Sequence, residues 1–479
     1  MNDRKADGIK TIKSIFSYSI ANIIALIVSL LSIPILTRII SVSDLGVSTS
    51  FSTLQNILTI ICLLSIYIAI DRMLLDVKKK EFEFLSSIYL FSDMFAVVIF
   101  IIYFIFRKYL NMIFGFDTWM MLLMFSFIIL TNGCTLLVAY WNFKNKYKYT
   151  FLYNLFVSPV SQILSLILSY LFIKNKYLGR ILGLNIFNVC FGFFCGIYIV
   201  RKGKFKFKWG YVKEALFISL PMIPHLLAQV LLTSCDLLMI KNMIGLKEAG
   251  IYSMAYTISN ILYTVLLQLF SPWSPWFYRR MHNDELDSIK NNSKILMIFS
   301  AFLCLGLFTV APEMIHLFLR KEYMEAIYII PPICIGIYFE IMYKFFYDVE
   351  YFYKRNKLIA IFSVSASIIN IILNYFGLKI FGYRAAAYTT LISYLILLIL
   401  HYIGMKKVEK RVLFDTKFLM LISIILLILG YVNIIIVYNF ILRYVLLLLI
   451  GILLLIKYKN LLLNLLYIFI KKEKVDFKE

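Results

Sequence analysis

The chain has 479 residues, of which 62% are hydrophobic and only 16% are charged, and it carries a formal net charge of +23. About fourteen membrane spans of about 20 residues each would use most of the hydrophobic residues. The composition excludes a soluble globular protein, and it also excludes disordered, collagen-like and disulfide-rich chains, which are polar, glycine-periodic or rich in cysteine. The sequence is that of a protein embedded in a lipid bilayer.

Apolar runs of membrane-spanning length follow one another along the chain. Unbroken runs of this length satisfy their backbone groups in lipid only as helices, whereas barrel strands would alternate over about 10 residues. We therefore predict an all-α polytopic membrane protein with about 14 transmembrane helices. The first run is too long for a signal peptide and is expected to remain as a span. The predicted spans are 15–40, 45–70, 84–106, 118–140, 151–173, 178–200, 215–240, 249–270, 295–311, 327–348, 358–378, 385–403, 418–438 and 441–456.

Basic residues are distributed unevenly between the predicted loops. When the N-terminus is placed in the cytoplasm, loops on that side carry roughly three basic residues for each one outside, which supports this orientation and a cytoplasmic C-terminus. The most basic loop, 201–209, alternates basic and aromatic residues, which is typical of a segment at the lipid headgroups. Membrane topology therefore accounts for the positive charge, and we expect no nucleic-acid partner.

A repeat with an offset of 204 residues relates the two halves of the chain. Residues 44–58 align without gaps with residues 248–262, and the same offset brings Arg180 onto Arg384. Because six helices separate the copies, both copies start on the same side of the membrane. They are then related by a pseudo-twofold axis along the membrane normal, as in transporters built from parallel repeats.

This repeat predicts two parallel-related six-helix bundles followed by two C-terminal helices. Two similar bundles that meet on an axis leave a central cleft, and rocking one against the other exposes the cleft to alternate sides. The architecture favours transport before any site is identified. The predicted domains are an N-terminal bundle at 1–205, a second bundle at 206–412, and two extra helices with a basic cytoplasmic tail at 413–479.

The predicted span 327–348 concentrates charged side chains. Glu340, Lys344 and Asp348 follow one another at intervals of four residues, which predicts that they share one helix face. A charge near the bilayer centre costs on the order of 2.5 to 3.5 kcal/mol, so each must meet a partner or a wet cavity. One reading is a row of ion pairs at a helix interface. In the other, this face lines the cleft, with Lys344 binding an anionic substrate and Glu340 taking up a proton.

Asp93 and Asp236 are two further acidic residues within predicted spans. A buried carboxylate that binds a proton is what a proton-coupled carrier requires, so both are candidate coupling residues. Asp236 lies near the outer end of its span, and the alternative there is an interfacial carboxylate paired with Lys241. For Asp93, which lies deeper, the alternative is a structural residue.

Four arginines lie at predicted span ends, Arg72 on the cytoplasmic side and Arg38, Arg180 and Arg384 outside. Most such residues anchor helix ends at the headgroups. Arg180 and Arg384 are related by the repeat, which favours a shared place at the outer mouth of the cleft. Since the planar guanidinium suits phosphate oxygens, these arginines join Lys344 as candidate substrate-binding residues.

Span 215–240 contains Pro221, Pro224 and His225. Proline removes a backbone donor inside a helix, so this span should bend, and the two prolines are a candidate hinge. His225 is a candidate coupling residue. The alternative is a neutral histidine hydrogen-bonded to a carbonyl that the prolines free.

Patterns for metal binding and for ATP binding are missing from the sequence. The seven cysteines form no CxxC pair and the four histidines form no cluster, so we expect no metal site. The chain has no GxxxxGK[ST] loop. We therefore expect no cofactor, and transport rather than enzymatic catalysis.

Two stretches of the sequence resemble a known family. They are Ser32 to Gly46, which includes SIPILTR, and Ser219 to Ser253, which includes SLP, DLLMI and GIYS. Both look like the polysaccharide-biosynthesis flippases of the multidrug/oligosaccharidyl-lipid/polysaccharide exporter superfamily, and the match is best to the Wzx-type oligosaccharide flippases. The resemblance extends over nearly the whole chain, including the number of spans.

The resemblance implies a flippase that moves an undecaprenyl-diphosphate-linked oligosaccharide repeat unit from the cytoplasmic to the outer leaflet by alternating access. It places the chain in the bacterial cytoplasmic membrane, in a pathway for O-antigen, capsule or another polysaccharide. Arg38, Asp236 and the charged span 327–348 fall where this family carries polar residues. The resemblance also implies H+ or Na+ as coupling ion, and membrane lipids, a polysaccharide polymerase and other assembly proteins as partners.

Other functions remain open from the sequence. A multidrug exporter or a lipid-linked cell-wall precursor flippase of the same superfamily would share the repeat, although a drug exporter favours an acidic cleft and the charges here include Lys344. A membrane polysaccharide polymerase or glycosyltransferase would need a large outer loop or a catalytic domain. The longest predicted outer connection, 312–326, is too short for that.

Overall fold

A computed structural model describes residues 28, 31–77, 80–144, 146–270 and 273–457, and every regular element in these ranges is helical. Residues 31–39 are helical, whereas most of the predicted first span and the tail from 458 onward lie outside the described residues. The elements are α2 (Val42–Cys62), η1 (Ile66–Ala69), α3 (Ile70–Val77), α4 (Glu81–Ile105), α5 (Arg107–Phe114), α6 (Thr118–Phe143), α7 (Tyr147–Leu171), α8 (Lys176–Lys202), α9 (Trp209–Ser219), η2 (Leu220–Met222), α10 (Ile223–Met243), α11 (Leu246–Phe270), α12 (Trp273–His282), α13 (Leu286–Phe318), η3 (Lys321–Tyr328), α14 (Ile330–Phe352), α15 (Asn356–Phe381), α16 (Ala385–Val408), α17 (Thr416–Ile435) and α18 (Phe440–Lys457).

The long helices confirm the predicted fold class. Within the described residues, 11 helices are long and apolar enough to cross a membrane, and the pair η3 and α14, bent by 48°, makes a twelfth. The helix α18 is apolar but shorter. Every predicted span from 45–70 onward coincides with one of these helices, because long apolar runs have no other way to satisfy their backbone groups in lipid.

Two predicted spans are interrupted. In the second predicted span, the helix α2 ends at Cys62. The chain then passes through Leu64 and Ser65, which have φ angles of 52° and 45°. In the seventh, a turn of 3-10 helix separates α9 from α10, with Pro221 inside that turn and Pro224 in the first turn of α10. Missing proline donors explain why the regular helix stops there; the hinge role stays a prediction.

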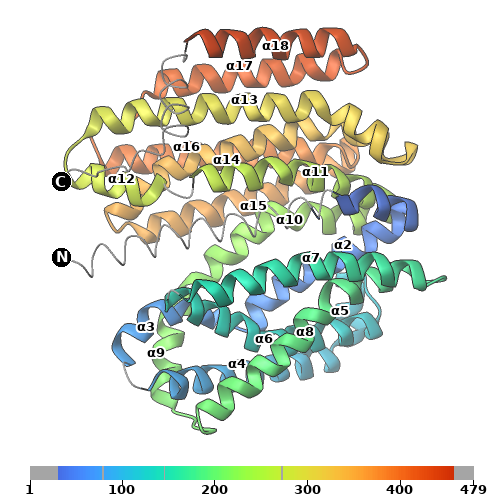
Figure 1. Cartoon of the computed structure of the whole chain (residues 1–479), viewed down its shortest axis with the longest axis vertical. Coiled ribbons are helices and arrows are strands. Elements are labelled where there is room, and N and C mark those ends of the chain that lie inside the picture. Colours follow the sequence, from blue (N-terminus) through green and yellow to red (C-terminus); the bar gives the residue numbers. More distant parts are fainter. Residues whose placement is uncertain (1–27, 29–30, 78–79, 145, 271–272, 458–479) are drawn as a thin grey trace.

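The two halves of the sequence form two bodies of helices, with α2 to α9 in the lower part of Figure 1 and α11 to α18 in the upper part. Their internal packing is equivalent. In the first body α8 packs against α6 and α7, and in the second body α16 packs against α14 and α15. The additional helices α17 and α18 pack against α13. This equivalence agrees with the sequence repeat, while the boundaries at 205 and 412 stay predictions.

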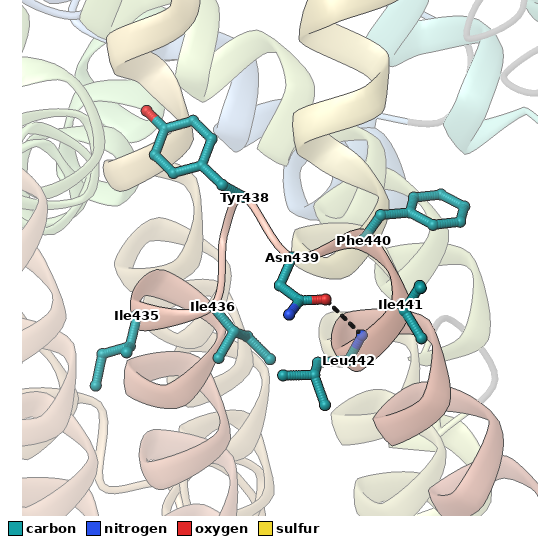
Figure 2. Close-up of a pocket in the computed structure, with 7 residues that line it drawn as sticks. All are labelled: Ile435, Ile436, Tyr438, Asn439, Phe440, Ile441 and Leu442. Carbon is teal, nitrogen blue, oxygen red and sulfur yellow. Dashed lines mark hydrogen bonds between the residues drawn. The ribbon is translucent and has the colours of Figure 1, made fainter.

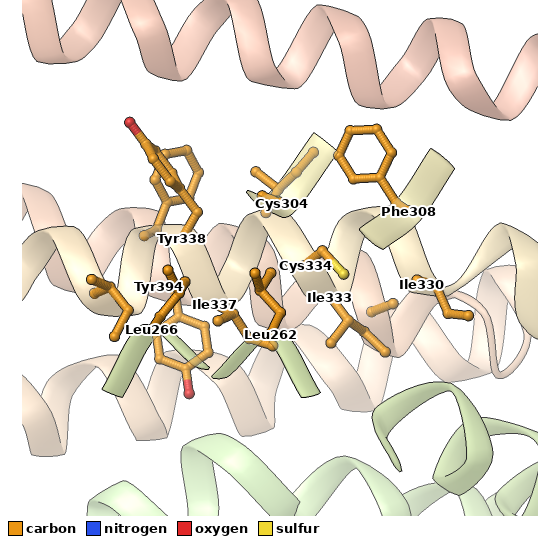
Figure 3. Close-up of a cluster of buried hydrophobic side chains, with 14 of the residues drawn as sticks. Leu262, Leu266, Cys304, Phe308, Ile330, Ile333, Cys334, Ile337, Tyr338 and Tyr394 are labelled. Atoms are coloured by element: carbon orange, nitrogen blue, oxygen red, sulfur yellow. The ribbon is translucent and has the colours of Figure 1, made fainter. Parts of the chain in front are cut away.

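The core of the second body lies where α11, α13, α14 and α16 meet. Leu262 of α11, Cys304 of α13, Cys334 and Ile337 of α14 and Tyr394 of α16 are all buried and lie together (Figure 3). The helix α14 is buried along nearly its whole length. A polar side chain on α14 therefore meets other protein groups rather than lipid, and it needs partners there.

The halves contact each other where α2 crosses α10 and α11. A Cβ atom added to Gly46 would lie 2.2 Å from the carbonyl oxygen of Leu246, and one added to Gly250 would lie 2.0 Å from the carbonyl oxygen of Val42. Gly250 and Leu246 are the counterparts of Gly46 and Val42 at the offset of 204. The contact is therefore reciprocal, as a twofold relation requires, and only glycine permits so close an approach.

We expect Gly250→Ala to weaken the contact between the halves, because the added methyl group would overlap the Val42 carbonyl oxygen. Overpacking of this kind costs about 1–3 kcal/mol, so the thermal unfolding midpoint of the purified protein should fall. Gly306→Ala in α13 is the matched control, since a Cβ atom there meets nothing within 4 Å. Equal unfolding midpoints for the two variants would show that α2 and α11 are not packed closely at Gly250.

Candidate functional site

Glu340 and Lys344 lie on the side of α14 that is turned toward α11 and α16. Both side chains are half-buried. The Nζ atom of Lys344 lies 5.5 Å from the centre of the Tyr263 ring on α11, and Tyr394 of α16 lies close to the Glu340 carboxylate. The structure therefore brings a carboxylate and an ammonium group together with tyrosines from two neighbouring helices.

Lys344 has no carboxylate partner within the 4.0 Å of an ion pair among the described residues. It interacts with Glu340 and Asp348 only at longer range. The row of contacting ion pairs that the spacing allowed is therefore not formed. An ammonium group in a span without such a partner remains able to bind an anion from outside the protein.

Asp348 contacts a different neighbour, while its place on one helix face with Glu340 and Lys344 stays a prediction. Its buried carboxylate accepts hydrogen bonds from Ser274 at 2.8 Å and Tyr278 at 2.9 Å, both on α12. Side chains four residues apart drift by about 40° around a helix, so Asp348 is rotated by about 80° from Glu340. Its role in the structure is to fasten α12 to α14.

Asp236 of α10 is fully buried in a cluster of hydroxyl and amide groups. Its carboxylate accepts hydrogen bonds from Tyr252 of α11 at 2.6 Å, from Asn374 of α15 at 2.6 Å and from Thr390 of α16 at 2.5 Å. The alternative pairing with Lys241 is not formed, because Lys241 points into the connection between α5 and α6. One carboxylate thus joins four helices of the second half.

Asn370 extends this cluster. Its amide donates to the Thr390 hydroxyl at 3.1 Å and its carbonyl oxygen accepts from Asn374 at 3.0 Å, and both asparagines are fully buried. The potential ligands are all oxygens, which hard cations prefer. Sequence analysis identified Asp236 and missed the two asparagines, although two amides four residues apart in an apolar span were an available signal.

The other predicted acid, Asp93, lies in the first half and belongs to a separate polar cluster. It is half-buried on α4 and accepts a hydrogen bond from Asn132 of α6 at 2.6 Å. Asn132 also donates to Ser92 at 2.8 Å, and Tyr89 lies beside the carboxylate. The structure therefore places the two predicted coupling acids in different halves, each held between helices of its own half.

Arg180 and Arg384 both approach η3, on the side predicted to face outward. Arg180 of α8 lies near Tyr323, and Arg384, which precedes α16, pairs with Glu325 at 3.1 Å. The two repeat-related arginines both lie beside η3, while a shared place at the outer mouth of the cleft stays a prediction. Arg384 has a carboxylate partner, whereas Nη1 of Arg180 makes no hydrogen bond to any described residue.

Arg72 and Arg38 are exposed. Arg72 lies on α3, beyond the end of the α2 span, and Arg38 precedes the start of that span. The backbone carbonyl of Arg38 accepts a hydrogen bond from the Arg320 guanidinium at 2.6 Å. This bond joins the first half to the second. The side chains of Arg38 and Arg72 are exposed and can contact lipid headgroups.

The end of α10 provides a further contact between the halves. Lys241 donates to the Gly115 carbonyl at 2.7 Å, and its Nζ atom lies 3.1 Å from the centre of the Phe116 ring. Asn242 donates to the carbonyl of Ile113 at 3.3 Å. Together with the α2 crossing, these contacts close the halves against each other at the end that the basic residues assign to the outside.

Two pairs of ionisable side chains on neighbouring helices escaped the sequence analysis. Glu350 of α14 and His401 of α16 lie 2.8 Å apart and are both fully buried. Arg443 of α18 is buried and donates to Glu313 of α13 at 3.0 Å, which fixes α18 to the rest of the second half. The partners lie 51 and 130 positions apart along the chain, so spacing along one helix could not reveal them.

Outside the spans, Glu409 and Arg411 hold the connection between α16 and α17. The guanidinium of Arg411 donates to Glu409 at 2.7 Å and also pairs with Asp284 in the turn before α13. This hydrogen bonding lowers the pKa of Glu409 to about 2, so the carboxylate is charged at neutral pH. The connection to the two C-terminal helices is thereby fixed to the neighbouring turn.

A hollow at the turn between α17 and α18 offers little chemistry. It is lined by Ile435, Ile436 and residues 438–442, and the side chain of Asn439 accepts from the Leu442 backbone amide at 3.1 Å (Figure 2). None of its lining residues is charged. We assign it no part in binding an anionic substrate.

Comparison with known proteins agrees with this architecture. A family model described as "Polysaccharide biosynthesis protein" matches residues 11–281. Curated proteins gave no match. Among solved structures, the fold is similar to that titled "Lipid II flippase MurJ, inward closed conformation", with a TM-score of 0.71, 18% sequence identity, and coverage of 93% of this chain and 99% of the other.

Transporters of the MATE family are also similar. An inward-facing multidrug resistance transporter gives a TM-score of 0.57 at 12% identity, covering 81% of this chain and 97% of the other. An outward-facing form gives 0.53 at 13% identity, with coverage of 82% and 95%. At such identities the likeness concerns the fold alone.

The helical fold with two equivalent halves is shared with these solved flippase and transporter structures. Since the family model matches more than half of the sequence, the chain belongs to the polysaccharide biosynthesis protein family. The resemblance found in the sequence is confirmed. Lipid and drug transporters share this fold, so the substrate has to be argued from the site itself.

Proposed function

We propose that the chain moves an undecaprenyl-diphosphate-linked oligosaccharide repeat unit from the cytoplasmic to the outer leaflet by alternating access. Family membership supports a substrate of polysaccharide biosynthesis. The observation that carries the proposal is Lys344, a half-buried ammonium group in a span with no carboxylate at ion-pair distance among the described residues. A diphosphate supplies the missing negative charge.

The surroundings of Lys344 suit the rest of such a headgroup. Tyr263 presents its ring face to Lys344, and its hydroxyl and that of the buried Tyr394 lie beside Glu340. Aromatic rings with a polar tip pack against sugars while bonding to their hydroxyls. An ammonium group at the centre disfavours an organic cation as substrate. In the proposed site Lys344 binds phosphate, while Glu340 binds sugar hydroxyls or takes up a proton.

The arginines define a route for the headgroup in this proposal. Arg72, exposed at the predicted cytoplasmic side, meets the diphosphate before it enters. The contacts at the end of α10 keep the outer side closed while the headgroup binds. When those contacts break, the headgroup leaves past Arg38, Arg180 and Arg384, whose planar guanidinium groups match phosphate oxygens. The polyprenyl tail stays in the lipid throughout.

Movement between the two states is proposed to bend the chain at Pro221 and Pro224, where α9 gives way to α10. The protein is proposed to lie in the bacterial cytoplasmic membrane, with both termini in the cytoplasm, on the basis of the basic loops. A polysaccharide polymerase and other assembly proteins would receive the repeat unit after it has crossed.

The Asp236 cluster is proposed as the coupling site, with a monovalent hard cation such as Na+ as its ligand. A proton needs only the carboxylate, whereas this site adds two amides and two hydroxyls from α11, α15 and α16. Turning the amides of Asn370 and Asn374 would direct carbonyl oxygens at a bound cation, which hard cations prefer. Cation binding would then draw the four helices together. In the first half, Asp93 is the candidate coupling residue.

We expect Lys344→Ala to abolish surface polysaccharide in cells that depend on this protein, because the diphosphate loses the ammonium group that binds it in the proposed site. Polysaccharide is measured on whole cells, and membrane insertion by immunoblot of the membrane fraction. Lys379→Ala is the matched control, a lysine on α15 of the same half whose partner is Tyr375. Normal polysaccharide in the Lys344 variant would remove this residue from the site.

Na+ should raise the thermal unfolding midpoint of the purified protein more than K+ or choline does. A ligand at ten times its Kd stabilises the folded state by about 1.4 kcal/mol. Asp236→Asn should abolish the difference between the salts, whereas Asp287→Asn, at an exposed position on α13, should keep it. If the three cations act alike on the unaltered protein, the Asp236 cluster is not a Na+ site.

A further inference from the structure

The Glu350 and His401 pair lies apart from both the Lys344 face and the Asp236 cluster. Glu350 is near the end of α14 and His401 is on α16, and the Nδ1 atom of His401 lies 2.8 Å from the carboxylate. Both side chains have no exposed surface. Neither takes part in the substrate or cation binding proposed above.

Close packing surrounds the pair. The imidazole is stacked on the Tyr343 ring with centres 5.1 Å apart, and the edges of Tyr347 and Phe362 complete its enclosure. A Cβ atom added to Gly404 would lie 2.1 Å from the Glu350 carboxylate. The carboxylate can therefore sit against α16 only because residue 404 is glycine.

Each member of the pair keeps one polar atom without a hydrogen-bond partner among the described residues. These atoms are Oε1 of Glu350 and Nε2 of His401. A buried charge pair that serves stability alone needs its remaining polar atoms satisfied, since an unsatisfied one costs about 1–3 kcal/mol. Two such atoms in one enclosed pair indicate a use other than fastening two helices.

Charge balance limits the pair to one proton while it is enclosed. A carboxylate beside an imidazolium and a carboxylic acid beside a neutral imidazole both carry one proton and no net charge. Removing that proton leaves a net negative charge, and adding another leaves a net positive one, either of which is costly without water. The pair can exchange its proton only when α14 and α16 loosen or when a neighbouring group carries the proton.

His225 is the neighbouring group to which we assign this transfer. It lies in the first turn of α10, is half-buried, and has no hydrogen-bond partner for its Nδ1 atom among the described residues. It is near enough to His401 for the charges of the two imidazoles to interact. The other elements packed on the pair present Tyr343 and Tyr347 from α14 and the apolar Phe362 from α15.

We propose that Glu350 and His401 form a proton-binding site of the second half, distinct from the Asp236 cluster and reached through His225. When α14 and α16 are closed on each other the pair holds one proton, and opening of that interface releases it toward His225. Coupling of this proton to transport rests on the proposed function, but proton binding itself does not. It can therefore be tested on purified protein without any substrate.

The test is a potentiometric titration of the full-length protein in detergent between about pH 5 and 8, the range in which an imidazole that opening of the interface exposes to water changes charge. We expect the double variant Glu350→Gln/His401→Gln to bind about one proton fewer per molecule than the unaltered protein. Exchanging both partners leaves no buried charge unpaired, which protects the fold. Glu350→Gln and His401→Gln alone should each lose the same proton, since the two groups titrate as one unit.

Glu313→Gln is the matched control, because it breaks another charge pair of the same half, whose partner Arg443 keeps its charge. This variant should lose stability and still bind as many protons as the unaltered protein over the same range. Equal proton uptake by all variants, with only their unfolding midpoints lowered, would overturn the proposal and leave the pair a fastening between helices. That result would not affect the Lys344 prediction, so the proposed function is tested independently of this proton site.

His225→Gln gives a second measurement. If the pair is reached through His225, the variant should take up the proton of the pair more slowly after a pH jump, followed by stopped flow with an indicator dye. His225 itself no longer titrates in this variant, so the rate of the remaining uptake is compared, not its amount. An unchanged rate would exclude His225 from the route.

Discussion

The close approach of α2 and α11 is the constraint on which the rest of this structure depends. Gly46 and Gly250 each lie against a carbonyl oxygen of the other half, and the two contacts are counterparts at the offset of the repeat. Helices that touch backbone to backbone at one place have a fixed point about which each half can turn while the remainder of the interface changes. In the proposed mechanism, the contacts of Lys241 and Asn242 are the ones that break.

Polar groups inside the spans fall into two kinds. Asp348, Arg443 and Asp93 have hydrogen-bond partners on neighbouring helices and so hold those helices together. Lys344 differs, since its interactions with carboxylates are only long-range. In a medium where a single charge is costly, this difference separates groups that stabilise the fold from the group proposed to bind substrate. The burial and the partners of a polar group show which kind it belongs to, whereas the presence of a polar residue in an apolar sequence does not.

The sequence was sufficient for what depends on neighbouring residues along the chain. The spans followed from the length of apolar runs, and the repeat followed from residues such as Gly46 and Gly250, which backbone contact restricts to glycine. The contact of Asp348 with α12 was not predicted, because spacing along one helix does not show which neighbouring helix a side chain meets. The pair of Glu350 and His401 was missed for a related reason, since its members come from different helices and neither has a spacing pattern of its own.

The helix α16 connects the proposed sites. Thr390 belongs to the Asp236 cluster and Tyr394 lies beside Glu340, while His401 pairs with Glu350. These positions follow one another along a single helix. In the proposed mechanism, a cation that binds near Thr390 therefore changes how α16 packs against α14 along the whole length of the helix. In the proposed mechanism the cation, the headgroup and the proton therefore act on the same helix interface. Each ligand would favour the arrangement of α14 and α16 that it binds best, which is the differential affinity that coupling requires.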